Sequence, residues 1–254
     1  MTLFQRRFVF LAVAFLCIIL PLAGYMLYYA PGKGLPAAGQ NTVIPEKTAA
    51  AAQANVAPAT KPVIDKNLPE LILVNKAVHM GANQEPADLR VIHGVYLRKM
   101  AADALQTMLD AAEREGIHGL VVYSGYRSYQ TQVAVYANKI ASLRPEYGDQ
   151  AETMAQKLVA PPGASEHQTG LAVDLTLREF LDYEYVLNYD FANTPQGRWL
   201  RDNSWKYGFI LRYDDGKEAK TNIDYEPWHF RYVGLEHAKK IYELGVCLEE
   251  YLSM

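Results

Sequence analysis

The stretch Ser165-Glu166-His167-Gln168-Thr169-Gly170-Leu171-Ala172-Val173-Asp174-Leu175-Thr176 places a histidine in a loop directly before an alternating strand. From Gly170 onward the polarity changes with the two-residue period of a β-strand, so one face is apolar and comprises Leu171, Val173 and Leu175. Asp174 lies on the opposite face, away from the core side. The small Ala172 beside it leaves room for an ion and for the side chain of His167. The stretch therefore predicts a strand that carries part of a metal site.

A second short stretch, Glu226-Pro227-Trp228-His229, supplies another imidazole and another carboxylate. A catalytic zinc takes three protein ligands and leaves a position for water, whose pKa it lowers to about 7. We expect His167, Asp174 and His229 to be the three ligands of Zn²⁺. Glu226 precedes His229 by three residues, and Pro227 fixes the backbone between them. We therefore expect Glu226 to act as the catalytic base on the water without binding the metal.

Arg127 is the best candidate for a fixed cation near these groups. It lies in Ser124-Gly125-Tyr126-Arg127-Ser128, just after a predicted buried strand at residues 120–123 and before a predicted helix. Its guanidinium can brace a developing oxyanion or hold the terminal carboxylate of a peptide through a bidentate contact. Glu166 and Gln168 stand on either side of His167 in the sequence, and we interpret both as residues at the rim of the site.

The remaining pattern favours an α+β domain over a parallel α/β fold, because few βαβ alternations occur. Apolar residues recur at helical spacing from Leu97 to Ala112, and Gly116, shortly after them, offers a C-terminal cap to this helix. Thr194-Pro195 marks the start of another helix, and a last amphipathic helix is expected to run continuously from Leu235 through Leu248. We predict a small antiparallel sheet that bears the zinc site and is flanked by helices.

The N-terminal region predicts a membrane anchor followed by a tether. The 22 residues from Phe8 to Tyr29 carry no charge, and as a helix at about 1.5 Å per residue they would span the roughly 30 Å bilayer core. Arg6 and Arg7 precede them, which places the N-terminus in the cytoplasm. A cleaved signal peptide is the alternative. We expect an anchor at residues 1–30, a disordered Ala/Pro-rich linker at 31–65, and a catalytic domain at 66–254.

Composition excludes some classes of function. The net charge of -3 and the pI near 6.1 provide no broad positive field, so we expect no nucleic-acid partner. The two cysteines, Cys17 in the apolar span and Cys247 near the C-terminus, are not expected to pair, and we place Cys247 in the core.

The chain resembles the VanY-type D-alanyl-D-alanine carboxypeptidases, zinc peptidases that trim the stem peptide of peptidoglycan. Their metal pattern, S-x-H-x-x-G-x-A-x-D followed by E-x-x-H, is filled by Ser165, His167, Gly170, Ala172, Asp174, Glu226 and His229. The resemblance runs from about Leu71, where Leu-Ile-Leu-Val-Asn-Lys looks like the family's opening strand, to near Val246. One departure is Asn222, where many relatives have glycine; asparagine tolerates a left-handed backbone, so the turn is expected to persist.

The resemblance implies further site residues. It assigns Arg127 to substrate binding and transition-state stabilisation, and it places Gln132 and Ser165 among residues that line the substrate site. Trp228 fits either core packing or a wall of the pocket.

The resemblance also implies the reaction, which is hydrolysis of the terminal D-alanine of stem peptides ending in D-Ala-D-Ala. We expect a monomeric, single-pass protein of the bacterial cell membrane with its catalytic domain outside the cytoplasm, acting on peptidoglycan stem peptides or their precursors. An L,D-carboxypeptidase acting on tetrapeptide stems would use the same ligands and base. A dipeptidase is disfavoured by the anchor and tether, and a non-catalytic wall-binding module by the retention of ligands and base.

Overall fold

A computed structural model of the chain describes residues 64–254. The predicted anchor at 1–30, and all of the predicted linker except its last two residues, lie outside this range. Within residues 64–254, no helix has the length and apolar character that crossing a bilayer requires.

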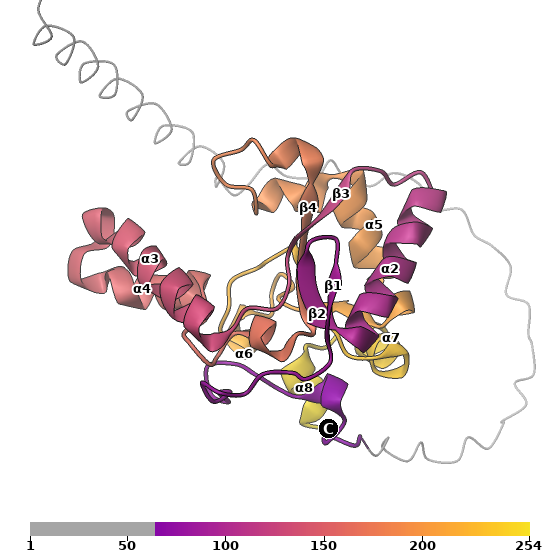
Figure 1. The fold of residues 1–254 in the computed structure, drawn as a ribbon, viewed down its shortest axis with the longest axis horizontal. Helices are drawn as coiled ribbons and strands as arrows, with labels where there is room; N and C mark the ends of the chain where they lie inside the picture. Colours follow the sequence, from indigo (N-terminus) through magenta and orange to yellow (C-terminus); the bar gives the residue numbers. More distant parts are fainter. Residues whose placement is uncertain (1–63) are drawn as a thin grey trace, which may run out of the picture. The chain divides into compact units, whose positions relative to one another are not determined.

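The predicted small antiparallel sheet is present and has four strands in the order β3-β4-β6-β5 (Figure 1). The strands are β3 (Leu120–Ser124), β4 (Ala172–Leu177), β6 (His229–Tyr232) and β5 (Phe209–Leu211). Every residue of β4 is buried, because strands cover both its edges and helices or loops cover its faces. Its register places Asp174 opposite His229 on one side and opposite Ser124 on the other.

A separate hairpin, β1 (Leu89–Ile92) and β2 (Val95–Arg98), precedes the sheet in the chain. His93 and Gly94 form its two-residue turn, and both have positive φ angles, 46° and 85°. Such turns match the twist of a hairpin, and glycine adopts them without steric cost. The predicted opening strand at Leu71 is wrong, since that segment holds only the short 3-10 helix η1 (Pro69–Leu71) and no strand.

Helices flank the sheet as predicted. The longer ones are α2 (Lys99–Arg114), α3 (Tyr129–Tyr147), α4 (Ala151–Leu158), α5 (Pro195–Asn203) and α7 (Leu235–Leu244), and the short ones are α6 (Glu218–Thr221) and α8 (Leu248–Leu252). The predicted cap is present, with the Thr194 hydroxyl accepting from the backbone N–H of Gly197 at 3.0 Å. The expectation of one continuous last helix is wrong, because Gly245 has a φ of 64° and ends α7 before α8 begins.

Further single turns of 3-10 helix connect these elements. They are η2 (Gly148–Gln150), η3 (Glu166–Thr169), η4 (Arg178–Phe180), η5 (Tyr189–Asn193) and η6 (Ser204–Tyr207). Asn222, the departure from the family pattern, has a φ of 57° and so adopts the left-handed conformation that the turn requires.

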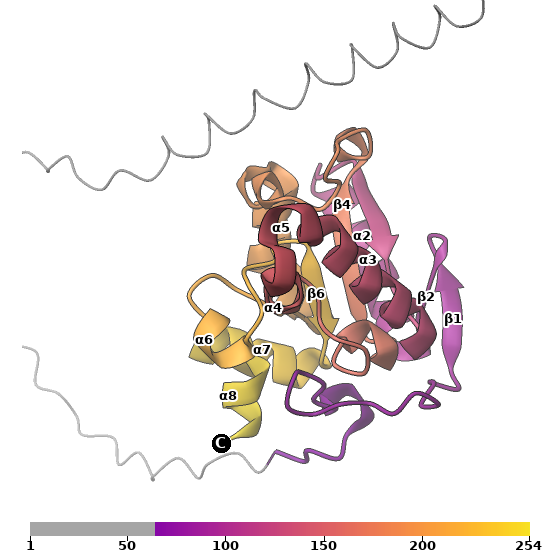
Figure 2. The same cartoon turned by 90° about the vertical axis from the view of Figure 1, so that its left-hand side faces the viewer.

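Two apolar clusters hold the sheet and helices together. The larger joins α2 and α5 to the sheet, with Leu105, Met108 and Leu175 fully buried, and the smaller joins α7 and α8 to β5. The α3–α4 hairpin takes little part in either: over its 19 residues α3 buries only Gln132 and Tyr136. It projects from the sheet in Figure 1 and lies in front of β4 and β6 in Figure 2.

The start of α5 generates a stability prediction. A Cβ atom on Gly197 would lie 2.0 Å from the backbone oxygen of Phe191, which no side-chain rotation can relieve. Gly197→Ala should therefore lower the free energy of unfolding by about 1–3 kcal/mol through overpacking. Urea unfolding monitored by circular dichroism measures it. Gly81→Ala is the matched control, since its Cβ would meet nothing closer than the Gln84 side chain at 3.6 Å; equal effects of the two substitutions would contradict the prediction.

Candidate metal centre

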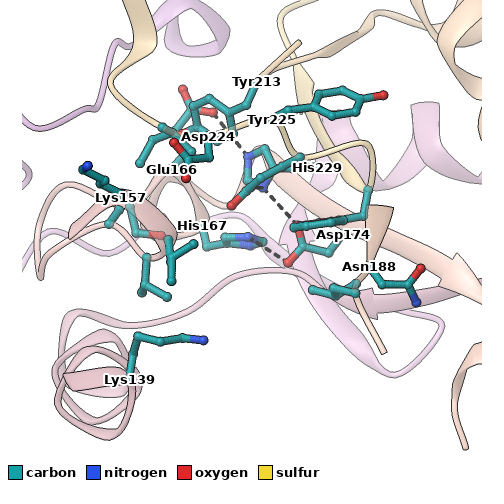
Figure 3. A pocket seen from close by; sticks show the side chains of 18 of the residues that line it. Lys139, Lys157, Glu166, His167, Asp174, Asn188, Tyr213, Asp224, Tyr225 and His229 are labelled. Carbon is teal, nitrogen blue, oxygen red and sulfur yellow. Dashed lines mark hydrogen bonds and ion pairs between the residues drawn. The ribbon is translucent and has the colours of Figure 1, made fainter. Parts of the chain in front are cut away.

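The sheet register brings the three predicted metal ligands to one point. Asp174 lies in β4, His229 begins β6 as its cross-strand partner, and His167 arrives from η3 just before β4. All three side chains are buried. One donor atom from each lies within 4.8 Å of the others (Figure 3).

The Asp174 carboxylate bridges the two imidazoles. Its Oδ2 lies 3.1 Å from Nε2 of His167, and its Oδ1 lies 2.9 Å from Nδ1 of His229. The two rings meet edge to face, with centroids 4.9 Å apart and planes at 83°. Burial alone would raise the pKa of Asp174, but the two histidines hold that pKa well below its ordinary value. The carboxylate is therefore ionised and available as a ligand.

In each histidine, the ring nitrogen that points away from Asp174 has a partner of its own, and this partner determines which nitrogen can bind a metal. His167 Nδ1 lies 2.6 Å from the backbone oxygen of Gly125, which can only accept, so Nδ1 carries the hydrogen and Nε2 presents its lone pair to Asp174. His229 Nε2 faces Glu166 Oε2 at 3.6 Å, and neither atom has another hydrogen-bond partner within residues 64–254. His229 Nδ1 donates to the ionised Asp174, which can only accept, so a metal that binds Nδ1 takes the place of this proton while Nε2 keeps its hydrogen toward Glu166.

With that proton displaced, one nitrogen of each histidine and the Asp174 carboxylate form a donor set that zinc accepts. The site also attracts positive charge: burial alone would lower the pKa of His229, yet the Asp174 and Glu166 carboxylates raise it to about 9. His167, Asp174 and His229 therefore fit a zinc ion.

Glu166 is buried in the structure, and its interpretation as a rim residue is wrong. Its Oε1 accepts from Arg212 Nε and from Arg231 Nη1, both at 2.8 Å. Burial alone would raise the pKa of Glu166, but the two arginines hold that pKa well below its usual range. The remaining oxygen faces His229, so Glu166 belongs to the outer shell of the metal centre. Gln168, also interpreted as a rim residue, is buried as well, and its Nε2 donates to the backbone oxygen of Gly81 at 2.8 Å.

The two arginines connect Glu166 to both ends of the described chain. Arg212 makes a bidentate contact with Glu249 of α8, with distances of 2.8 and 2.6 Å. Arg231 Nη2 donates to the backbone oxygens of Glu70 and Ile72. The residues that orient His229 therefore depend on segments far from it in sequence.

The predicted base, Glu226, lies beside the metal ligands. Its Oε2 is 3.7 Å from Nδ1 of His229. Burial raises the pKa of Glu226 to about 7, and the charge of Asp174 adds to the rise, whereas His229 and Arg127 oppose it. A carboxylate with this pKa can both take and return a proton near neutral pH.

The other predicted site residues take different positions. Arg127, Ser165 and Trp228 line the cleft above the metal ligands, and Arg127 Nε is buried without a hydrogen-bond partner in the described part of the chain. Trp228 both lines the cleft and packs against the main core, so the two interpretations of this residue, as pocket wall and as core, hold together. Gln132 is not among the cleft-lining residues; its Nε2 donates to the backbone oxygen of Ala160 at 2.7 Å and ties α3 to the loop after α4.

The cleft has a volume of about 450 Å³ and two contrasting walls. The α3–α4 hairpin contributes Lys139, Lys157 and Leu158, while the other wall is aromatic and includes Tyr185, Tyr189, Tyr225 and Trp228. Tyr189 packs on Trp228, with ring centroids 5.8 Å apart. The metal ligands lie at the bottom between these walls (Figure 3).

Residues 94–235, which hold all of these ligands, match the family model VanY, described as D-alanyl-D-alanine carboxypeptidase. The chain belongs to this VanY family. Among curated proteins, it is 45% identical over 193 residues to the putative carboxypeptidase YodJ of Bacillus subtilis, covering 72% of this chain and 67% of that one. The predicted family and its carboxypeptidase class are thereby confirmed.

Two solved structures of VanY relatives share the fold. An LdcB LD-carboxypeptidase superposes with a TM-score of 0.63 at 43% identity, covering 73% of this chain and 87% of that chain. A mutant of a vancomycin-resistance D,D-pentapeptidase VanY, solved in complex with Zn(II), gives a TM-score of 0.63 at 38% identity, covering 72% and 99%. The zinc in that relative agrees with the donor set found here.

The outer shell generates a prediction about metal affinity. Glu166→Gln should weaken zinc binding by about 10- to 100-fold, because the carboxylate that faces His229 Nε2 is lost. Competition with a chromophoric chelator measures the affinity. Glu249→Gln is the matched control, since it also removes a carboxylate from Arg212 but leaves Glu166 in place. An equal loss of zinc affinity in both variants would show that general destabilisation, and not the contact with His229, is responsible.

Proposed function

We propose that this VanY-family protein is a zinc-dependent D,D-carboxypeptidase that hydrolyses the terminal D-alanine of peptidoglycan stem peptides ending in D-Ala-D-Ala. The observation that carries the proposal is the convergence of His167, Asp174 and His229 at the bottom of a cleft, with Glu226 beside them. The D,D-pentapeptidase relative with bound zinc supports the same activity.

His167, Asp174 and His229 hold the zinc. When bound, zinc acts as a Lewis acid that acidifies a coordinated water and polarises a carbonyl oxygen. Glu226 takes the proton of the water that attacks the penultimate carbonyl carbon. It then delivers that proton to the nitrogen of the departing D-alanine, and its pKa of about 7 suits both steps.

Arg127 supplies the fixed positive charge of the cleft. Its backbone N–H donates to the backbone oxygen of His167 at 3.1 Å, which ties it to the ligand loop. Its buried Nε has no partner within residues 64–254, so an oxyanion or a terminal carboxylate of the substrate completes its hydrogen bonding. Ser165 lies in the same wall and adds a hydroxyl donor, and Trp228 provides an apolar surface for an alanine methyl group. Gln132 donates to the backbone oxygen of Ala160, a residue that lines the cleft, and so supports the lining indirectly.

An L,D-carboxypeptidase is the second candidate, because the LdcB LD-carboxypeptidase is 43% identical to this chain and superposes with the same TM-score as the D,D-pentapeptidase. The metal ligands and the base do not discriminate between the two, since both reactions use the same hydrolytic step.

The test is D-alanine release by the zinc-loaded full-length chain from matched pentapeptide and tetrapeptide stems. We expect release from the pentapeptide and a fall in kcat of about 10²- to 10⁴-fold in Glu226→Ala, because the proton acceptor is lost. Asp224→Asn, which changes a neighbouring cleft carboxylate, is the control and should retain activity. Preference for the tetrapeptide would establish the L,D alternative. No release from either peptide with zinc bound would favour a wall-binding module.

Substitution of Arg127 shows whether its guanidinium binds the terminal carboxylate of the substrate or the oxyanion. If the guanidinium binds the terminal carboxylate equally in the ground and transition states, Arg127→Ala raises KM with little change in kcat. If it binds the oxyanion, kcat falls by about 10²-fold or more. Because Nε is buried and close to the ligand loop, we expect the fall in kcat to dominate. Steady-state kinetics on the pentapeptide decide this, with Arg127→Lys retaining only part of the activity since lysine lacks the planar fork.

We further propose that residues 1–30 anchor the protein in the cell membrane and that the linker at 31–65 presents the catalytic domain, as a monomer, to the wall outside. The uncharged run from Phe8 to Tyr29 and the preceding Arg6 and Arg7 support this orientation. Fractionation of cells that produce the full-length chain should place it in the membrane pellet. Recovery of a shortened protein from the medium would support a cleaved signal peptide instead.

A further inference from the structure

The stretch at residues 71–76 carries the opening pattern of the family, yet it forms no strand and the proposed reaction assigns it no role. It belongs to a longer segment, residues 70–84, which runs past α6, α8 and η3 (Figures 1 and 2). We call residues 70–84 the strap. Leu71 and Val74 are almost fully buried, so the strap is packed onto the domain. Its hydrogen bonds show which groups it holds in place.

Gln168 fastens the strap to the loop that carries His167. It directly follows that ligand, its side chain is almost fully buried, and its Nε2 donates to the backbone oxygens of Gly81 and Gln84 at 2.8 and 3.2 Å. Gln168 and His167 share the single 3-10 turn η3, so a movement of one displaces the other. The side chain therefore connects the strap to the backbone beside a metal ligand.

A backbone contact joins the strap to the same loop before His167. The N–H of Met80 donates to the backbone oxygen of Gly163 at 2.8 Å. Gly163 has a φ of 84°, and a Cβ atom there would lie only 2.7 Å from the backbone oxygen of Met80, so the close approach requires glycine. The contacts at positions 163 and 168 thus hold the loop on both sides of the ligand.

Lys76 joins the strap to the loop that carries Glu226. Its Nζ donates to the backbone oxygen of Asn222, four residues before that base. Burial lowers the pKa of Lys76, and the charge of the nearby Asp224 opposes this shift. Further along the loop, the backbone N–H of Glu226 donates to the backbone oxygen of Tyr213 at 3.0 Å. The loop is therefore held by the strap at its start and by Tyr213 at the base itself.

The strap also reaches the charged groups behind the metal centre. Arg231 Nη2 donates to the backbone oxygens of Glu70 and Ile72 at 3.0 and 2.8 Å. Asn75 Nδ2 donates to Oε1 of Glu249 at 3.2 Å. One continuous segment therefore contacts the ligand loop, the base loop and the outer shell, which come from separate parts of the sequence.

We propose that the strap is a positioning element of the zinc centre, with Gln168 and Lys76 as the positioning residues through which it acts. Gln168 holds His167 in place for the metal. Lys76 holds the loop of Glu226 in place for proton transfer, and this second role rests on the proposed function. Because coupling between two binding equilibria is reciprocal, zinc binding in turn stabilises the docked strap.

The first experiment compares Gln168→Met and Lys76→Met in the full-length chain, since both remove a hydrogen-bond donor and keep an unbranched side chain. Gln168→Met should weaken zinc binding by about 3- to 10-fold in competition with a chromophoric chelator, because it disturbs a ligand through its neighbour. Lys76→Met should leave zinc affinity unchanged. At saturating zinc it should lower kcat for D-alanine release by about 10-fold at unchanged KM, because a displaced base impairs the transition state alone. Lys76→Arg keeps a donor and should recover most of kcat.

Gln196→Met and Lys240→Met are the matched controls. Each removes a side-chain hydrogen-bond donor of the same kind outside both the strap and the cleft, and each should behave as the unaltered protein. If Gln168→Met and Lys76→Met change zinc affinity and kcat in the same proportion, the strap only supports the fold. If neither changes either quantity, the strap has no role in the centre. Both results refute the proposal.

Limited trypsin digestion of the unaltered full-length chain tests the coupling without any substitution. Cleavage after Lys76 requires the strap to open, whereas Lys66 is exposed ahead of the strap and Lys240 lies in α7. Zinc should slow cleavage after Lys76 by about 3- to 10-fold more than cleavage after Lys240, and should leave cleavage after Lys66 unchanged. Equal slowing after Lys76 and Lys240 would show general stabilisation by zinc and refute the coupling.

The digestion also separates this inference from the proposed function, because it does not depend on turnover. Selective protection of the strap by zinc, without release of D-alanine from any stem peptide, would support the strap and refute the carboxypeptidase. Release of D-alanine without selective protection would refute the strap and leave the carboxypeptidase intact.

Discussion

The antiparallel register between β4 and β6 is the constraint on which the metal centre depends. It sets Asp174 opposite His229, and a slip of one residue would turn one of the two side chains to the other face of the sheet. The register is protected because every residue of β4 is buried, so a slip would also place Asp174 among Leu171, Val173 and Leu175 on the apolar side. Loop positions then need only deliver His167 and Glu226 to a point already defined by two strands.

The charged residues behind the centre show how this arrangement is maintained in a dry interior. A buried carboxylate is costly unless its hydrogen bonds are satisfied, and Arg212 and Arg231 meet that requirement for one oxygen of Glu166. Arg212 is in turn paired with Glu249, and Arg231 donates hydrogen bonds to the backbone oxygens of Glu70 and Ile72. The network leaves one carboxylate oxygen for His229, so packing of the domain and orientation of a metal ligand are a single physical arrangement.

Local patterns in the sequence were enough to predict a strand over residues 170–176, observed at 172–177, the convergence of the ligand residues and the Thr194 cap. The left-handed Asn222 was expected from its position in the family pattern. Interactions over long sequence separations were not predictable in this way. Glu166 was misplaced at the rim because its partners lie 46 and 65 residues away and a charged loop residue ordinarily faces water. The β1–β2 hairpin was missed because its turn is His93-Gly94, not one of the common Asn-Gly or Asp-Gly pairs, and the segment at Leu71 is apolar without pairing with a strand.

The contact between Arg212 and Glu249 also has a consequence for local opening of the domain. Glu249 lies in α8, and its carboxylate is one of two that bind the buried Arg212 guanidinium, the other being that of Glu166. If α8 detached, Arg212 would keep Glu166 but lose Glu249, and removing one partner of a buried ion pair is costly. The buried charges thereby oppose hydrogen exchange through local opening of a five-residue helix that is too short to be stable by its own backbone hydrogen bonds.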